Sequence, residues 1–408
     1  MTIDFTFPPE VEEARQRMRA FVVENVRPTE ERLIADSSGR SDWKAELDRL
    51  RVLARELDLW MPHMPREWGG VGLGPTALAA VSAEAAKSRF GSYVVNCYAP
   101  DEGNMHTLLH WGTEEQKNRY LKPMCDGTMR SCFAMTEPEV AGSDPTLMQT
   151  RAVLEGEEWV INGHKWFISG ARGAQFAILL ARTEDEPEVP QAATSAFLVD
   201  LPSAGWEIVR DVATMSGSHN HCEIRINELR VPATSLLGER GQGHRLGQYR
   251  LGPARLAHCM RWLGQIEIAL DMMVARSIER YSHGSYLAEK QGIQWLISES
   301  TIELYQAKLM VLHAAYRIEH DLEFKTEVSM AKHHVANTLW RVVDRAVQVH
   351  GALGYSKDSP LADMLLQARW SRFADGADEI HKWRVAESAI DAYRRDGSTS
   401  AATGDLPL

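Results

Sequence analysis

Several features are missing from this 408-residue sequence, and each absence excludes a class of protein. No apolar run reaches the roughly 20 residues that a transmembrane helix needs, so we expect no membrane span. The first eight residues contain an early acid and lack the basic-then-apolar order of a secretory signal, so we predict a cytoplasmic protein. Cysteine is scarce, and no two cysteines form a C-x-x-C pair, which is typical of reduced thiols and argues against disulfides or a zinc site. The five are Cys97, Cys125, Cys132, Cys222 and Cys259.

Concentrated positive charge is also missing. The formal net charge is −11, and the lysines and arginines are scattered along the chain, so we predict no nucleic-acid partner. The pairs His219/His221 and His333/His334 have no further ligands at metal-site spacing, so we predict no metal.

The usual phosphate-binding and nucleophile motifs are absent as well. There is no Walker loop and no G-x-S-x-G elbow. Gly241, Gly243 and Gly247 come close to the dinucleotide-binding pattern, but their spacing is wrong and they precede a helical region. We interpret them as a junction between domains.

The period of the hydrophobic residues changes twice along the chain and predicts three domains, as expected for a chain too long for one core. Residues 1–130 follow a helical period, 131–240 alternate as strands do, and 241–395 return to a helical period in segments long enough for a bundle. Residues 396–408, rich in Ser, Thr and Gly, are predicted to form a flexible tail. Two local predictions are a loop from Met61 to Pro75 and a helix start at Thr113 with Gln116 three residues later.

Two segments of the strand region have the composition of a flavin site. Phe133–Asp144 combines a hydroxyl, Thr136, with tight-turn residues that expose backbone donors. Asn162–Gly170 places the aromatic pair Trp166 and Phe167 beside the hydroxyl of Ser169 on a predicted strand. Either segment alone is also compatible with an ordinary β-hairpin that has a core tryptophan.

With these segments, the chain resembles the acyl-CoA dehydrogenases over residues 10–395. Pro65–Gly72, Gln348–Asp358 and Arg372–His381 also match that family. The resemblance implies an α-helical N-terminal domain, a central β-barrel-like domain and a C-terminal four-helix bundle. It further implies FAD as cofactor, an acyl-CoA substrate and a homodimer or homotetramer. Ala99–Met105, Arg250–Arg261 and Ala374–His381 are similar to a subgroup associated with long-chain, branched or 4-hydroxy-acid-derived acyl-CoAs.

The chemistry of this family requires a carboxylate and a flavin on either side of the Cα–Cβ bond, because the base removes the α-proton while a hydride leaves the β-carbon. The resemblance places the base at Asp375, where most relatives have glutamate, and makes flavin N5 the hydride acceptor. The other position that relatives use is occupied by Ala254. A free aspartate titrates near pH 4, so we expect substrate binding to raise its pKa. Asp375 could also cap the helix that follows it.

The developing enolate oxygen needs a hydrogen-bond donor. By resemblance, the backbone N–H of Asp375 and a flavin ribityl hydroxyl supply it, and Arg255 contributes positive potential and substrate contacts. A helix salt bridge is the alternative role for Arg255.

The remaining site residues also follow from the resemblance. Phe133, Met135 and Thr136 would contact the isoalloxazine, Phe167 and Ser169 would lie beside it, and Ser143 would lie at its edge or that of the acyl-CoA. The diphosphate and adenosine would be bound across subunits. The residues assigned to these and the remaining cofactor contacts are Arg280, Ser282, Gln291, Gln348, Gly351, Ala352, Ala377 and Glu379. His283 and Ala352 stand where relatives usually have Phe and Gly.

The resemblance predicts dehydrogenation to a trans-2-enoyl-CoA, with an electron-transfer flavoprotein as acceptor. Two alternatives share the fold. One is an oxygen-reactive flavoenzyme, either an acyl-CoA oxidase or a nitroalkane oxidase; the latter also uses an aspartate base. The other is a nucleic-acid-associated flavoprotein of the alkylation-response type, which the acidic net charge disfavours.

Overall fold

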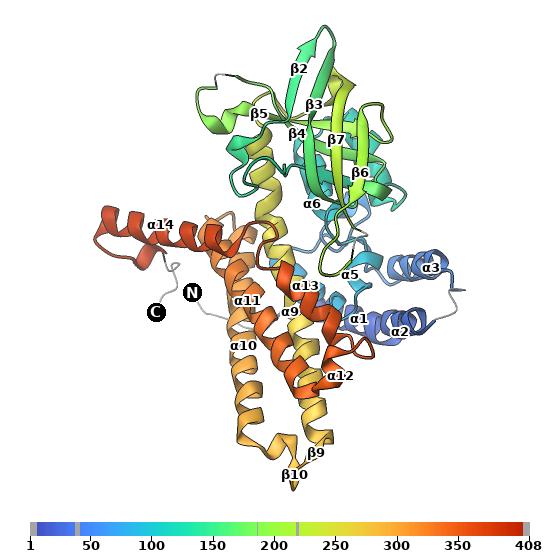
Figure 1. Ribbon diagram of the computed structural model, residues 1–408, viewed down its shortest axis with the longest axis vertical. Helices are drawn as coiled ribbons and strands as arrows, with labels where there is room; N and C mark the ends of the chain where they lie inside the picture. The colour runs from blue at the N-terminus through green and yellow to red at the C-terminus, as the bar shows by residue number, and fades with distance from the viewer. Residues whose placement is uncertain (1–5, 37–40, 186, 218–219, 403–408) are drawn as a thin grey trace. The chain divides into compact units, whose positions relative to one another are not determined.

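The computed structural model describes residues 6–36, 41–185, 187–217 and 220–402 (Figure 1). The predicted order of helices, then strands, then helices is confirmed. The chain divides into two compact units, each described separately below. The first comprises Met1–Arg66, Gly70–Val95 and Arg255–Leu408, and the second comprises Glu67–Gly69 and Asn96–Ala254.

The second unit is built on an eight-stranded sheet with the order β6-β7-β3-β2-β4-β5-β8, in which β1 pairs in parallel with β4. Buried alternating residues such as Ile161, Phe197 and Ile224 form its core. The strands are β1 (Ser131–Ala134), β2 (Arg151–Glu155), β3 (Glu158–Ser169), β4 (Phe176–Arg182), β5 (Thr194–Asp200), β6 (Trp206–Asp211), β7 (His221–Pro232) and β8 (Leu236–Leu237).

Short helices precede this sheet in the sequence: α6 (Asp101–Trp111), α7 (Glu114–Gln116) and α8 (Lys122–Cys125). The helix start predicted at Thr113 is confirmed. The Thr113 side chain accepts a hydrogen bond from the backbone N–H of Gln116, whose side chain accepts one from the backbone N–H of Thr113. The glycine- and proline-rich stretch from Met61 contains a short 3₁₀ turn, Arg66–Trp68, before α4 begins at Pro75, which confirms the predicted loop.

The first unit is helical. Its N-terminal part contains α1 (Pro9–Phe21), α2 (Arg27–Ala35), α3 (Trp43–Glu56), α4 (Pro75–Ala85) and α5 (Gly91–Val94), and its C-terminal part contains most of α9 (Gly243–Glu279), then α10 (Gln291–Glu319), α11 (Lys325–His350), α12 (Ala352–Tyr355), α13 (Leu361–Trp370) and α14 (Asp378–Asp396). A short hairpin, β9 (Tyr281–Ser282) and β10 (Ser285–Tyr286), connects α9 to α10. Apolar residues from several of its helices, including Ile266 on α9, Val311 on α10 and Leu339 on α11, form one buried core.

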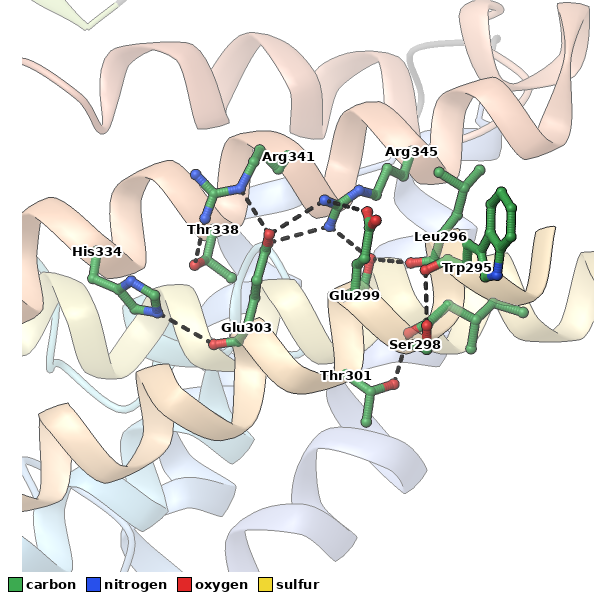
Figure 2. A network of polar contacts seen from close by, with 12 residues as sticks. Trp295, Leu296, Ser298, Glu299, Thr301, Glu303, His334, Thr338, Arg341 and Arg345 are labelled. Carbon is green, nitrogen blue, oxygen red and sulfur yellow. Dashed lines mark hydrogen bonds and ion pairs between the residues drawn. The ribbon is translucent and has the colours of Figure 1, made fainter. Parts of the chain in front are cut away.

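Helices α10 and α11 are also joined by a charged network centred on Glu303, shown in Figure 2. The carboxylate of Glu303 accepts hydrogen bonds from Arg341 at 3.0 Å and from both terminal nitrogens of Arg345 at 3.2 Å. Arg345 also pairs with Glu299 at 3.0 Å. Because several partly buried charges share these contacts, the network fixes the pairing of the two helices better than an isolated surface pair would.

All five cysteines are free thiols, as predicted, and the structure shows that all five are also buried. Within the described residues, no helix has the length and apolar content needed to cross a membrane. The same part of the chain contains no group of three or more His, Cys, Asp or Glu that could hold a metal ion. His219 and the end of the predicted tail, 403–408, lie outside the described residues.

Candidate functional site

Asp375 lies in the loop between α13 and α14, where the backbone is strained. Its φ is 52°, a left-handed conformation that non-glycine residues rarely adopt, and Gly376 follows with φ 115°. The N-cap of α14 is Ala377, which makes no side-chain capping bond. The alternative role of Asp375 as the cap of this helix is therefore wrong, because Gly376 and Ala377 separate Asp375 from the first residue of α14 and Ala377 is the N-cap.

Two basic side chains bind consecutive carbonyl groups of this loop. Arg255 on α9 donates from Nε to the backbone oxygen of Asp375 at 2.7 Å. Lys332 on α11 donates from Nζ to the backbone oxygen of Gly376 at 2.6 Å. These bonds fix the orientation of two adjacent peptide groups and so stabilise the unusual backbone conformation.

The loop is surrounded by buried titratable groups. Lys332 is fully buried, and burial lowers its pKa to about 8, while the nearby carboxylates of Asp378 and Asp375 oppose the shift. Burial and the charges of Lys332 and Arg255 lower the pKa of His381 to about 3, so its ring is neutral. Burial also lowers the pKa of Arg255, against the opposing charge of Asp375. Positive potential is thus concentrated around a carboxylate that remains 24% exposed.

A histidine that the sequence analysis did not single out lies beside Asp375. Nε2 of His258 on α9 is 3.4 Å from Oδ2 of Asp375. The imidazole is stacked on Trp262, with ring centroids 5.4 Å apart, and meets Trp370 edge-on at 5.6 Å. The first unit therefore places a strained, partly exposed carboxylate between basic groups and a wall of aromatic rings.

In the second unit, the two segments with flavin-site composition are joined directly. The backbone N–H of Trp166 donates to the oxygen of Thr136 at 3.1 Å. Lys165 donates from Nζ to the oxygen of Met135 at 2.9 Å and to the carboxylate of Glu137 at 2.8 Å. Lys165 and Glu137 are both buried, and burial lowers the pKa of Lys165 to about 8 against the charge of Glu137. The ion pair thereby anchors the start of the Phe133–Asp144 segment to β3.

Phe167 has the features of a ligand-binding residue. Its φ is 53°, its side chain is 44% exposed, and it lies where the pairing of β3 with β7 shifts register between Lys165 and Ile168. A large exposed aromatic side chain held in strained backbone at a β-bulge commonly marks a binding site. Nearby, the hydroxyl of Ser169 is 2.9 Å from Nδ1 of His221.

The remaining predicted flavin contacts of this unit surround the same segment. Met135, Thr136 and Gly142 line a shallow hollow that is open to solvent. The Phe133 ring is covered by the guanidinium of Arg250 at 4.2 Å from its centroid, and Ser143 is exposed. The exposed ring of Phe167 and the hydroxyls of Thr136 and Ser169 suit a planar heteroaromatic ring with polar edges.

The predicted diphosphate and adenosine contacts form a separate part of the first unit. Figure 1 shows the β9–β10 hairpin at the opposite end of α10 and α11 from α14. Arg280, Ser282 and Gln291 lie at or beside this hairpin, with Arg280 and Gln291 exposed. Gln348, Gly351 and Ala352 are exposed where α11 ends, and Ala377 and Glu379 lie at the start of α14. The structure therefore brings Arg255 to Asp375. Ala377 and Glu379 follow Asp375 closely in the chain, whereas the residues at the hairpin lie apart from this pair.

Comparison with known proteins identifies the family. The models described as the N-terminal, middle and C-terminal domains of acyl-CoA dehydrogenase match residues 8–128, 132–229 and 241–390. The chain belongs to the acyl-CoA dehydrogenase family. FadE2 of Mycobacterium tuberculosis is 37% identical over 98% of this chain and 99% of its own length. A solved structure from Mycobacterium abscessus is 34% identical, with a TM-score of 0.90 over 95% of this chain and 100% of that one.

Some relatives are much longer. Acyl-CoA dehydrogenase family member 10 of mouse is 35% identical over 95% of this chain, but the match spans 37% of that protein. Membership of the family makes this chain an FAD-dependent oxidoreductase. The exposed aromatic ring of Phe167 and the hollow beside Thr136 fit such a cofactor.

Proposed function

We propose that the chain dehydrogenates an acyl-CoA thioester to the trans-2-enoyl-CoA, with Asp375 as the base that takes the α-proton. The observation that carries this assignment is the conformation of Asp375. The backbone of Asp375 has a strained φ of 52°, Arg255 donates a hydrogen bond to its carbonyl oxygen, and its carboxylate is still partly open to solvent. Backbone strain of this kind is common at functional sites.

The surrounding residues support this chemistry. The positive charges of Arg255 and Lys332 stabilise the negative charge that develops on the thioester as its proton leaves. Trp262 and Trp370 supply apolar walls that limit water near the carboxylate. As the acyl group displaces the remaining water, the pKa of Asp375 is expected to rise and make it a stronger base.

FAD is the second component, and bound FAD supplies the acceptor for the β-hydride. We assign its ring to Phe133, Met135, Thr136, Phe167 and Ser169, with Ser143 at its edge. The diphosphate and adenosine are assigned to Arg280, Ser282, Gln291, Gln348, Gly351 and Ala352, partly across subunits. Ala377 and Glu379 are assigned to the remaining cofactor contacts. Arg280 suits a diphosphate because its planar fork donates two parallel hydrogen bonds.

We further propose a homodimer or homotetramer. Exposed apolar residues recur with the same spacing on two helices: Trp295, Ile302 and Tyr305 on α10, and Trp383, Ile390 and Tyr393 on α14. Each set lies on one helix face, and such faces are typical of buried interfaces. We propose an electron-transfer flavoprotein as acceptor and a cytoplasmic location.

The substrate class follows from the subgroup features. We propose a long-chain, branched or 4-hydroxy-acid-derived acyl-CoA. The test is a spectrum recorded without oxygen while the purified yellow protein is mixed with acyl-CoAs of each type. Bleaching of the flavin by at least one of them is the expected result. Bleaching by a nitroalkane while every acyl-CoA fails would replace this proposal by a nitroalkane oxidase.

A further inference from the structure

We propose that His258 is a positioning residue for the base: with its ring proton fixed on Nε2 by Arg261, it donates to Oδ2 of Asp375 and sets the orientation of that carboxylate. This inference rests on the proposed function, in which Asp375 takes the α-proton.

The direction of the hydrogen bonds follows from the chemistry of arginine. Arg261 lies one turn after His258 on α9, and its NH2 group is 3.3 Å from Nδ1 of the imidazole. A guanidinium can only donate, so Nδ1 must accept. The proton of the neutral ring therefore lies on Nε2, the nitrogen that faces Asp375 at 3.4 Å.

The plane of the ring is fixed as well. Trp262 stacks on one face of His258, at an interplanar angle of 18°, and Trp370 meets it at 83°. Only 12% of the imidazole is exposed. The direction of its Nε2–H bond is therefore set by packing, as expected of a group that orients another side chain.

The hydrogen bond gives the two carboxylate oxygens of Asp375 different roles. When Oδ2 accepts from His258, Oδ1 is the oxygen that takes the substrate proton, and rotation about the Cβ–Cγ bond is restricted. The 3.4 Å separation is longer than an optimal hydrogen bond, which is common for catalytic pairs before substrate binds. A neutral donor also favours the ionised carboxylate, which is the form that acts as a base.

The other titratable or charged groups around the pair are not replaced in the His258 variants, so these variants share them with the wild type. They are Arg255, Cys259 and Arg261 on α9, Lys332 on α11, and Asp378, His381 and Arg384 on α14.

Three variants separate orientation from packing. His258→Gln keeps a donor but not the ring, His258→Phe keeps the ring but not the donor, and His258→Met keeps neither while matching the length of glutamine. We expect the Phe and Met variants to lose about 10- to 100-fold in kcat with little change in KM, because the carboxylate is present but poorly oriented. The acid limb of their pH profiles should move to higher pH, because the donor that favours the ionised form is gone. The Gln variant should stay within about 5-fold of wild type.

The inference would be overturned if the kcat values of the variants do not follow this order. If the Phe variant retains the wild-type kcat and pH profile, or if the Gln variant is as slow as the Met variant, His258 acts only through packing. FAD content and melting temperature are measured for each variant, and should the His258→Phe substitution prevent folding, the Met and Gln pair still decides. The wild type is assayed in parallel with Asp375→Asn. If none of the acyl-CoAs reduces the flavin of the wild type, or if the Asp375→Asn variant has normal rates, the proposed function itself is overturned and this inference with it.

Discussion

Arg255 and Asp375 are joined through the backbone: Nε of the arginine donates to the carbonyl oxygen of the aspartate at 2.7 Å, a bond that does not involve the carboxylate. Replacing Arg255 by Met removes both this bond and a positive charge near the base. We expect kcat/KM to fall by about 10- to 100-fold, because the strained loop loses one of its anchors.

Steady-state kinetics with an acyl-CoA that bleaches the flavin measures this change. Arg394→Met is the matched control, because Arg394 is exposed near the end of α14 and pairs only with Asp391 among the residues that the structure describes. The role of Arg255 would be contradicted by an Arg255→Met variant as active as this control.

Gly376 is expected to tolerate no side chain. A Cβ at this position would lie 2.8 Å from Nε2 of His381, a rigid ring, and the φ of 115° is strained for any other residue. Gly376→Ala should therefore destabilise the protein by about 1–3 kcal/mol and lower kcat by displacing Asp375.

Urea unfolding and turnover measure the two effects. Gly292→Ala in α10 is the control, since no atom lies within 4 Å of its added Cβ, and it should be neutral or slightly stabilising. Equal stability of the two variants would show that the loop is not strained as described.

Lys332 is expected to make stability depend on alkaline pH. Its pKa falls from the usual 10.5 to about 8 in the folded protein, mainly through burial. Between these values the unfolded chain binds more protons, so folding becomes more favourable as pH rises. The stability of the wild type relative to Lys332→Met should therefore increase by about 2–3 kcal/mol from pH 7 to pH 10. Denaturant unfolding of both proteins at the two pH values measures this increase. If the difference in unfolding free energy between the two proteins is the same at both pH values, the lowered pKa of Lys332 is refuted.

The buried pair Lys165 and Glu137 is expected to behave as a unit. Removing one partner leaves an uncompensated buried charge, so Lys165→Met should destabilise by about 3–5 kcal/mol and lower FAD retention through the Met135–Glu137 segment. The double variant with Glu137→Gln should recover part of this loss. A full double-mutant cycle by urea unfolding gives the coupling energy, and strictly additive effects would contradict the pairing.

Much of the fold could be predicted because its signals are local. The helix start at Thr113 depends on residues three apart, and the change from helical to strand period near Ser131 is visible in the sequence. The positive φ of Phe167 and Asp375 could not be predicted, because tertiary contacts impose it on residues that normally avoid it.

The residues that surround Asp375 could not be predicted from sequence patterns either. Arg255 and Lys332 are 120 and 44 residues away from the carbonyl groups that they bind. Only the resemblance pointed to Arg255, and no periodicity distinguishes Lys332, His258 or His381 from ordinary helix residues. The histidine could have been noticed because it lies one turn from both Arg255 and Arg261 on the same helix, which places three polar residues on one face.

The most direct test of the central claim is the anaerobic rate of flavin reduction by an acyl-CoA in the wild type and in Asp375→Asn, measured by stopped-flow absorbance. The asparagine has the same size but cannot take the proton, so the variant should bind FAD and substrate normally and reduce the flavin several orders of magnitude more slowly. Reduction at a rate near that of the wild type would contradict the assignment of Asp375 as the base.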